Sequence, residues 1–222
     1  MILRFALNRI SIREEAGMMR NRPRVIVITG GIGTGKSAAV DIIKDLGYRV
    51  LDSDKIVHEG YKAGSPLYVR IVDAFGEEVS KDGKIDRQKL GRIVFNDEEK
   101  LRLLNSIVHG YVYEKLREGI ESCYDKVIFL DIPLILETRD LHEPIYDEIW
   151  LVYVSEETQR KRLRERALRE NKNPEDVLKI IDKQIPIEDK VFMVDLVINN
   201  EGTLEELKEK IQALLEEKSK GW

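Results

Sequence analysis

Short, nearly continuous apolar runs recur along the chain, and longer segments with helical spacing of apolar residues lie between them. The run at residues 24–30, RVIVITG, is rich in β-branched residues and is typical of a parallel strand buried on both faces. Further strands are expected at residues 48–54, 126–133, 148–155 and 196–200. Because helical segments alternate with these runs, the pattern predicts an α/β fold with a parallel five-stranded sheet and right-handed crossovers.

Polar residues with a preference for helix ends indicate where the helices begin. A serine or asparagine before proline is typical of a helix cap, and a threonine or asparagine three residues before glutamate resembles a capping box. Such signals occur at Ser65-Pro66, Asn96 with Glu99, Ser155, Asn173-Pro174, and Thr203 with Glu206. We therefore expect a helix to begin at each of these positions.

Two segments between the predicted strands are too long to be simple connections. Residues 55–125 read as helical throughout, and residues 156–192 form a second helical segment after the fourth strand. Structureless connections of this length are rare in compact domains, so we expect each segment to form a lobe. The strands and remaining helices then form a core of residues 23–54, 126–155 and 193–222.

Residues 1–22 lie outside this pattern. They combine a short apolar opening with several arginines, but Glu14 and Glu15 argue against a transit peptide. The long apolar middle of a secretory signal is also missing. We expect either a flexible leader or an over-extended start codon.

Composition narrows the possible environments and partners. The chain has 222 residues, of which 42% are hydrophobic, and a net charge of −4, which gives no general attraction to nucleic acids or anionic membranes. Asp131 interrupts the longest apolar run, so no membrane span is expected. A single cysteine, Cys123, rules out an internal disulfide and fits a reducing compartment. We therefore expect a cytoplasmic protein without nucleic-acid or membrane partners. The sequence leaves the oligomeric state open, with a monomer favoured.

The segment Gly30–Ser37 reads GGIGTGKS and matches the phosphate-binding pattern G-x-x-x-x-G-K-S/T between a predicted strand and a predicted helix. Glycines let backbone N–H groups surround a phosphate, and the following helix N-terminus adds partial positive charge. Lys36 is expected to reach the β- and γ-phosphates, and the Ser37 hydroxyl to bind Mg²⁺. The predicted nucleotide-binding residues are Gly31, Ile32, Gly33, Thr34, Gly35, Lys36, Ser37 and Ala38. We expect ATP and Mg²⁺ as cofactors.

Acidic residues close the second and third predicted strands at the edge where ligands bind in parallel sheets. Asp52 and Asp54 are expected on one face of the second strand, where a carboxylate can accept or position the proton of an attacking hydroxyl. Either residue can instead cap the following helix. Asp131 ends the third strand, where it can hold Mg²⁺ through water, contact the phosphate acceptor, or cap the strand end.

Arginines crowd the second helical segment. Most of them fit a solvated helix with i,i+4 ion pairs, but Arg162 and Arg166 share a face and can cover the phosphates as part of a lid. His109, in the first helical segment, is equally compatible with a packing role and with a ligand-binding role.

Read together and in order, the motifs TGGIGTGKS, LDSDKIVHE, LGRIVFNDEEKLRLLNSIVH, LDIPLILE and VDLVINNEGTLEEL resemble dephospho-coenzyme A kinases. Gln159, Gln184 and Lys190 also match, and the resemblance covers about residues 24–215. It implies a P-loop fold like that of nucleoside monophosphate kinases, with a helical coenzyme A lobe and a lid. It also implies transfer of the ATP γ-phosphoryl group to the 3′-hydroxyl of dephospho-CoA.

The resemblance assigns roles to individual residues. It places a base-like aspartate at Asp54, the phosphate-loop lysine at Lys36 and lid arginines at Arg162 and Arg166. The family's acceptor-lobe pattern falls on Arg87, Leu90, Phe95, Asn105 and His109, although Gly110 stands where the family commonly has proline.

Two alternatives remain: a P-loop kinase of another small acceptor, such as a nucleoside monophosphate, or a nucleotide-dependent binding module without enzymatic activity.

Overall fold

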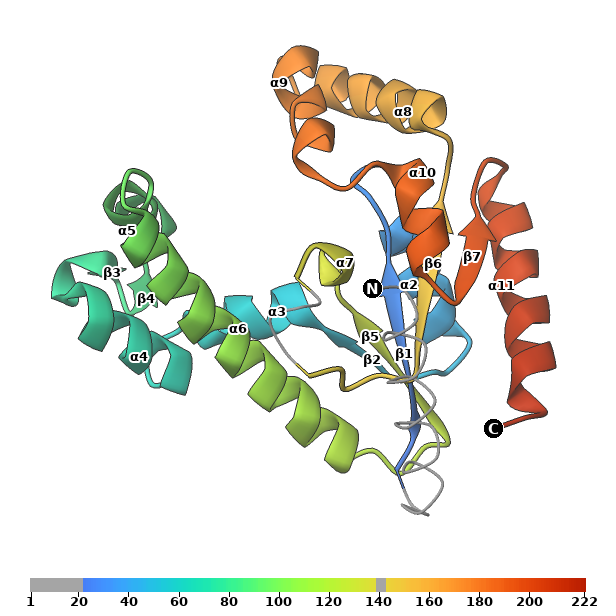
Figure 1. The fold of residues 1–222 in the computed structure, drawn as a ribbon, viewed down its shortest axis with the longest axis horizontal. Helices are drawn as coiled ribbons and strands as arrows, with labels where there is room; N and C mark the ends of the chain where they lie inside the picture. The colour runs from blue at the N-terminus through green and yellow to red at the C-terminus, as the bar shows by residue number, and fades with distance from the viewer. Residues whose placement is uncertain (1–21, 139–142) are drawn as a thin grey trace, which may run out of the picture.

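A computed structural model describes residues 22–138 and 143–222; residues 1–21 of the expected leader lie outside the described residues. The five predicted strands form one parallel sheet in the order β2-β5-β1-β6-β7 (Figure 1). Their bounds are β1 (Arg24–Thr29), β2 (Val50–Asp52), β5 (Val127–Asp131), β6 (Glu148–Tyr153) and β7 (Leu196–Asn199). The first strand in sequence is thus the central strand, which places the segment that follows it at the middle of the sheet edge.

Apolar layers cover both faces of the sheet, as near-continuous hydrophobic strands require. Ile26 and Ile28 pack on one face against α2 (Lys36–Asp45) and α11 (Leu204–Ser219). Val25 and Val27 point to the opposite face and pack with α6 (Glu98–Glu121) and α7 (Ile135–Thr138). Among residues 22–138 and 143–222, no helix is both long enough and apolar enough to cross a membrane.

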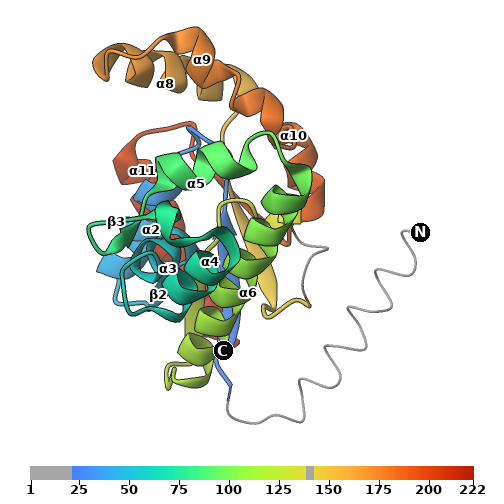
Figure 2. The same ribbon diagram turned by 90° about the vertical axis from the view of Figure 1, so that its left-hand side faces the viewer.

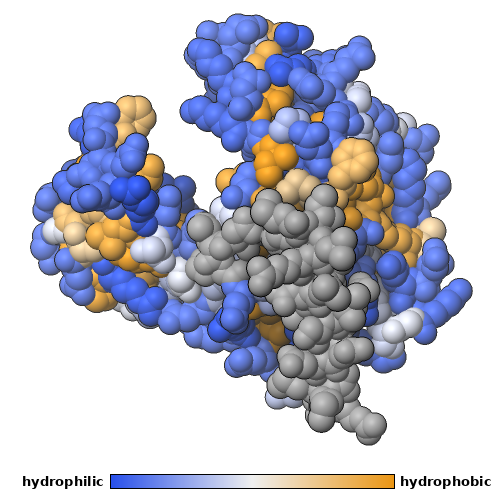
Figure 3. All heavy atoms as spheres, in the orientation of Figure 1, coloured by the Kyte–Doolittle hydropathy of each residue, from blue (hydrophilic) through white to orange (hydrophobic). Residues whose placement is uncertain are grey.

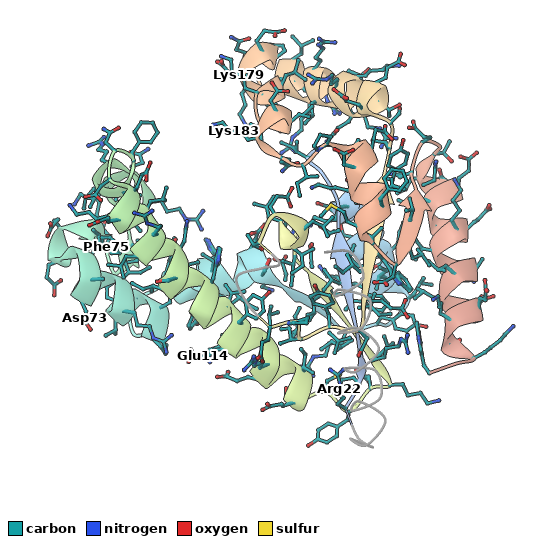
Figure 4. All side chains as sticks on the ribbon, in the orientation of Figure 1. Arg22, Asp73, Phe75, Glu114, Lys179 and Lys183 are labelled. Carbon is teal, nitrogen blue, oxygen red and sulfur yellow. The ribbon has the colours of Figure 1, made fainter. Side chains whose placement is uncertain are left out.

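A helical lobe lies to one side of the sheet and has an apolar core of its own (Figures 1 and 2). It contains α3 (Ser53–Gly60), α4 (Pro66–Phe75), the 3₁₀ turn Glu77–Val79, α5 (Arg87–Val94) and the first half of α6. Leu67 and Ile71 of α4 are fully buried in this core. Figure 4 shows Glu114 of α6 toward α4, where it pairs with Arg70 at 3.0 Å.

The sequence pattern predicted a lobe that is helical throughout, but the structure differs. It contains an antiparallel hairpin of β3 (Ser80–Lys81) and β4 (Lys84–Ile85). Asp82 and Gly83 form its turn with φ values of 51° and 72°. An Asp-Gly pair is a standard signal for such a turn, because both central residues need positive φ. The wholly helical prediction was therefore wrong at a position where the sequence carried the correct signal.

The second helical segment forms an arm above the carboxyl edge of the sheet (Figures 1 and 2). We call residues 156–183 the α8–α9 arm; it contains α8 (Glu156–Arg169), α9 (Pro174–Leu178) and a 3₁₀ turn at Ile181–Lys183. The chain returns to the core through α10 (Ile187–Lys190) and a 3₁₀ turn at Val191–Met193. Figure 3 shows the surface deeply hollowed between this arm and the helical lobe.

Most predicted helix starts are confirmed by side-chain caps. The caps are Ser65 for α4, Ser155 for α8, Asn173 for α9, and Thr203, in a capping box with Glu206, for α11. The expected cap at Asn96 is wrong. The Asp97 carboxylate caps α6 instead and accepts from the Lys100 N–H at 3.0 Å, while Asn96 lies in the turn that closes α5.

Candidate active site

The segment Gly30–Gly35 joins β1 to α2 and has the backbone that the phosphate-binding pattern predicts. Gly33 and Gly35 have φ values of 83° and 85°, which side-chain-bearing residues rarely adopt. A Cβ on Gly33 would also lie 2.9 Å from Leu163 Cγ, and one on Gly35 would clash with the Asn200 amide. No side chain caps the N-terminus of α2, so its first N–H groups are available to a bound anion.

Lys36 and Asp131 meet beneath this loop. The Lys36 ammonium forms an ion pair with the Asp131 carboxylate, and both side chains are largely buried. Burial raises the pKa of the Asp131 carboxyl, and Lys36 opposes that rise. Asp52 and Asp54 raise the pKa of Asp131 further, because their negative charges lie close enough to repel its carboxylate. A cation bound here would relieve both the burial cost and the repulsion.

The second strand ends earlier than predicted, and this changes the geometry of its two aspartates. β2 ends at Asp52, whose Oδ1 caps α3 by accepting from the Lys55 N–H at 2.9 Å. Asp54 lies in the first turn of α3, so the expected placement of both residues on one strand face was wrong. The Ser53 hydroxyl donates to the Asp131 carbonyl at 2.9 Å and thereby fastens the start of α3 to the end of β5.

Asp52 and Asp54 nevertheless line one pocket of about 860 Å³ between this edge and the helical lobe. Arg87 lines its far side and lies over the Tyr61 ring, with its guanidinium carbon 5.1 Å from the ring centroid. Burial raises the pKa of Tyr61, and Arg87 opposes the rise. His109 is half-buried in α6 and is not among the residues that line this pocket. The structure therefore brings Asp54 and Arg87 together, but not His109.

The two candidate lid arginines have different surroundings. Arg162 donates to the Asn200 carbonyl at 2.9 Å and lies beside Gly35 of the phosphate loop. Arg166 is 60% exposed and donates instead to the Glu170 carboxylate at 2.7 Å. Arg166 and Lys172 together lower the pKa of Glu170 to about 2. In this conformation only Arg162, of the two, lies next to the loop.

Three amide side chains hold the phosphate loop, and sequence reasoning assigned a role to none of them. The Gln159 amide donates to the Ile32 carbonyl at 2.6 Å, and the Ile32 N–H donates to Gln184 Oε1 at 3.1 Å. The Asn200 amide donates to the Thr34 carbonyl at 2.8 Å. Each contact spans more than 120 residues of sequence, so no local spacing signals it.

Comparison with known proteins identifies relatives along nearly the whole chain. The family model for dephospho-CoA kinase matches residues 24–206. The dephospho-CoA kinase of Carboxydothermus hydrogenoformans is 40% identical over 89% of this chain and 96% of its own length. That of Aquifex aeolicus is 37% identical over 86% of this chain and 96% of its own.

Solved structures agree with these sequence relatives. The crystal structure of TT1252 from Thermus thermophilus has a TM-score of 0.72 at 32% identity, and covers 89% of this chain and 98% of its own. The dephospho-CoA kinase from Campylobacter jejuni has a TM-score of 0.64 at 27% identity with the same coverage. With a P-loop between β1 and α2, a five-stranded parallel sheet and these matches, the chain belongs to the dephospho-CoA kinase family.

Proposed function

We propose that this protein transfers the γ-phosphoryl group of ATP to the ribose 3′-hydroxyl of dephospho-CoA, which is the last step of coenzyme A synthesis. One observation carries the proposal: the acceptor-sized pocket that Asp54 and Arg87 line is also lined by Asp52, and Asp52 is the neighbour in the sheet of Asp131, which pairs with Lys36. Its volume of about 860 Å³ suits a large acceptor. Membership of the family supports the same acceptor.

In this reaction the chain's own groups bind, position and neutralise charge. The loop N–H groups and Lys36 hold the β- and γ-phosphates of ATP, with residues Gly31–Ala38 forming the nucleotide-binding segment. Asp54 accepts a hydrogen bond from the acceptor hydroxyl and aligns it with the γ-phosphorus. Because the transition state for phosphoryl transfer is loose, alignment and charge neutralisation matter more than the basicity of Asp54.

The donor set at this edge fits Mg²⁺. Ser37 supplies a hydroxyl in the first turn of α2, and Asp131 and Asp54 supply carboxylate oxygens, the ligand type that Mg²⁺ prefers. No group of three or more histidine, cysteine or acidic residues within the described chain forms a metal site by itself, so phosphate oxygens and water must complete the coordination. When bound, the ion neutralises charge on the phosphates.

The remaining role assignments follow from position. We assign the neutralisation of phosphate charge to Arg162, which lies beside the loop, whereas Arg166 would first have to leave Glu170. We assign acceptor binding to Arg87, and a helix-capping role to Asp52 in addition to its place in the pocket wall. His109 as an acceptor ligand, the cytoplasmic location and the monomeric state stay predictions.

An assay of ADP release with a panel of acceptors tests the function. We expect ADP formation with dephospho-CoA and ATP, accompanied by 3′-phosphorylated product, and little with nucleoside monophosphates or shikimate. Preference for one of the other acceptors would replace the proposed substrate. Hydrolysis that is independent of any acceptor, or ATP binding without turnover, would favour a nucleotide-dependent binding module.

A further inference from the structure

Ile32, at the tip of the phosphate loop, is held by the first turn of the α8–α9 arm and by the residue that directly follows the arm. Its carbonyl accepts from Gln159 in the first turn of α8, and its N–H donates to Gln184, immediately after the arm. Its side chain packs against the small apolar core of the arm, formed by Leu163, Leu178 and Ile181. The loop tip is thus fastened to the arm through its main chain and its side chain.

The segment that follows the arm is itself fixed to the core next to β5. Glu137 of α7 accepts from the N–H of Ile185, the neighbour of Gln184, at 3.3 Å. The same carboxylate oxygen lies 2.7 Å from the Lys190 ammonium, and Lys190 is completely buried. The Glu137–Lys190 pair therefore determines where Gln184 can meet the loop.

This joint contains unpaired polar atoms. Within the described residues, the buried side-chain atoms that lack a hydrogen-bond partner are Gln159 Oε1, Glu137 Oε2 and Lys190 Nζ. Lys190 Nζ is nevertheless ion-paired with Glu137 Oε1 at 2.7 Å, so of these three atoms Gln159 Oε1 and Glu137 Oε2 are the ones left without a polar partner. Buried unpaired polar groups cost stability, and their concentration at one place is typical of functional sites.

We propose that Gln159 and Gln184 are positioning residues that hold the Ile32 peptide groups and make the nucleotide-binding shape of the loop depend on docking of the arm. Because Gln184 occupies the Ile32 N–H, the phosphate donors come from the residues that follow it, and the two glutamines orient the peptides that precede those donors. Displacement of the arm breaks the Gln159 bond and strains the Gln184 bond, because Gln184 directly follows the arm while its neighbour Ile185 is fixed to the core, and the loop loosens. ATP affinity is thereby coupled to arm position by side chains that do not need to touch the nucleotide.

Two variants test the proposal, one for each hydrogen bond to Ile32. Gln184→Ala removes the acceptor of the Ile32 N–H, and Gln159→Leu keeps the side-chain size but removes the donor to the Ile32 carbonyl. Gln159→Leu also removes the unpaired Oε1, which offsets part of its cost in stability. We expect each variant to weaken ATP binding about tenfold, the effect typical of one lost hydrogen bond, with little change in the KM for dephospho-CoA.

Amide exchange supplies a readout that general destabilisation would not reproduce. In nucleotide-free protein, Gln184→Ala should speed exchange of the Ile32 amide about tenfold or more, while amides of the central strand β1 keep their protection. An unchanged Ile32 exchange rate would overturn the proposal. So would an equal loss of affinity for both substrates, because that result indicates general damage.

A matched glutamine provides the control. Gln212 lies on the exposed face of α11 and bonds to Glu216 at 3.0 Å, and Gln212→Leu should leave ATP affinity and Ile32 exchange unchanged. The inference rests on the proposed function only in taking ATP as the nucleotide. Direct ATP binding and amide exchange need no acceptor, so they remain decisive even if dephospho-CoA proves not to be the substrate.

Discussion

Asp131 shows how one residue can serve a site at the expense of stability. Its pKa is raised because burial outweighs the attraction of Lys36, and Asp52 and Asp54 add repulsion. The folded protein therefore binds the Asp131 proton more tightly than the unfolded chain does. The resulting stabilisation is present below the unfolded-state pKa and is lost as pH rises through the folded-state pKa.

Asp131→Asn should therefore become more stable relative to the natural protein as pH rises from about 4 to about 7. Urea unfolding at several pH values measures this difference, and the same variant should lose activity because Lys36 loses its partner. A relative stability that falls with rising pH would mean that the ion pair outweighs burial.

Asp54 and Asp52 separate a chemical role from a structural one within three residues. Asp54→Asn should lower turnover at least about a hundredfold, because the acceptor hydroxyl loses its charged partner. Asp52→Ala should instead cost about 1 kcal/mol of stability, because α3 loses its cap, and should change turnover less. Steady-state kinetics and urea unfolding of both variants decide the assignment, which a near-native rate for Asp54→Asn would refute.

Lys36→Ala provides a second test of the charge distribution at the site. The substitution removes the Lys36 ammonium from the phosphates and leaves Asp131 buried without its counter-ion. We expect turnover to fall at least about a hundredfold, measured as ADP release at saturating ATP. Turnover within tenfold of the natural protein would exclude a central role for Lys36 in charge neutralisation.

Sequence reasoning at the residue scale found these groups because each belongs to a local pattern. Lys36 follows a glycine-rich loop, and Asp131 closes an apolar strand. Their pairing, and the contacts of Gln159 and Gln184 with Ile32, depend on which strands become neighbours. A single sequence carries no local signal for such contacts.

At the scale of elements, strands and caps were predictable because their signals are local and strong. All five sheet strands were predicted, but their ends were placed too late, since a helix cap such as Asp52 also fits at the end of a strand. The β3–β4 hairpin was not predicted because its strands have only two residues each, too few to show the alternating pattern of a strand around the Asp-Gly turn.

The joint between α7 and α10 leads to a prediction at this scale. Glu137→Gln leaves the buried Lys190 without a counter-ion, and Lys190→Met leaves Glu137 unpaired; each should cost about 3–5 kcal/mol. The double variant should recover most of that loss, because it removes both charges. Urea unfolding of the four proteins measures the coupling.

An exposed ion pair serves as the control for this cycle. Lys179 and Asp176 lie 2.9 Å apart on α9 and its C-cap, with both side chains mostly exposed, so Lys179→Met should leave the free energy of unfolding nearly unchanged. Additive losses in the Glu137–Lys190 cycle would show that the two charges do not depend on each other.

At the scale of the whole molecule, the sites proposed for the two substrates lie on different parts of the fold. The nucleotide loop is fastened to the α8–α9 arm, whereas the pocket with Arg87 lies between the sheet edge and the helical lobe, across the hollow from the arm (Figure 3). Sequence length and helical spacing predicted two lobes. The sequence did not predict which lobe would contact the phosphate loop, because that depends on the order of strands in the sheet.

This separation predicts opposite changes in the two KM values for variants in the α8–α9 arm region and variants in the helical lobe. Arg87→Ala should raise the KM for dephospho-CoA about tenfold or more, because a pocket cation for an anionic acceptor is lost, while the KM for ATP stays nearly constant. Arg70→Ala is the matched control: it breaks an ion pair between α4 and α6 in the same lobe without touching the pocket, and both KM values should hold. The glutamine variants of the arm should show the reverse pattern, with ATP affected and the acceptor not. If Arg87→Ala raised both KM values together, the lobe and the arm would have to act as one binding unit. The assignment of the acceptor to the Arg87 pocket and of ATP to the loop beside the arm would then fail.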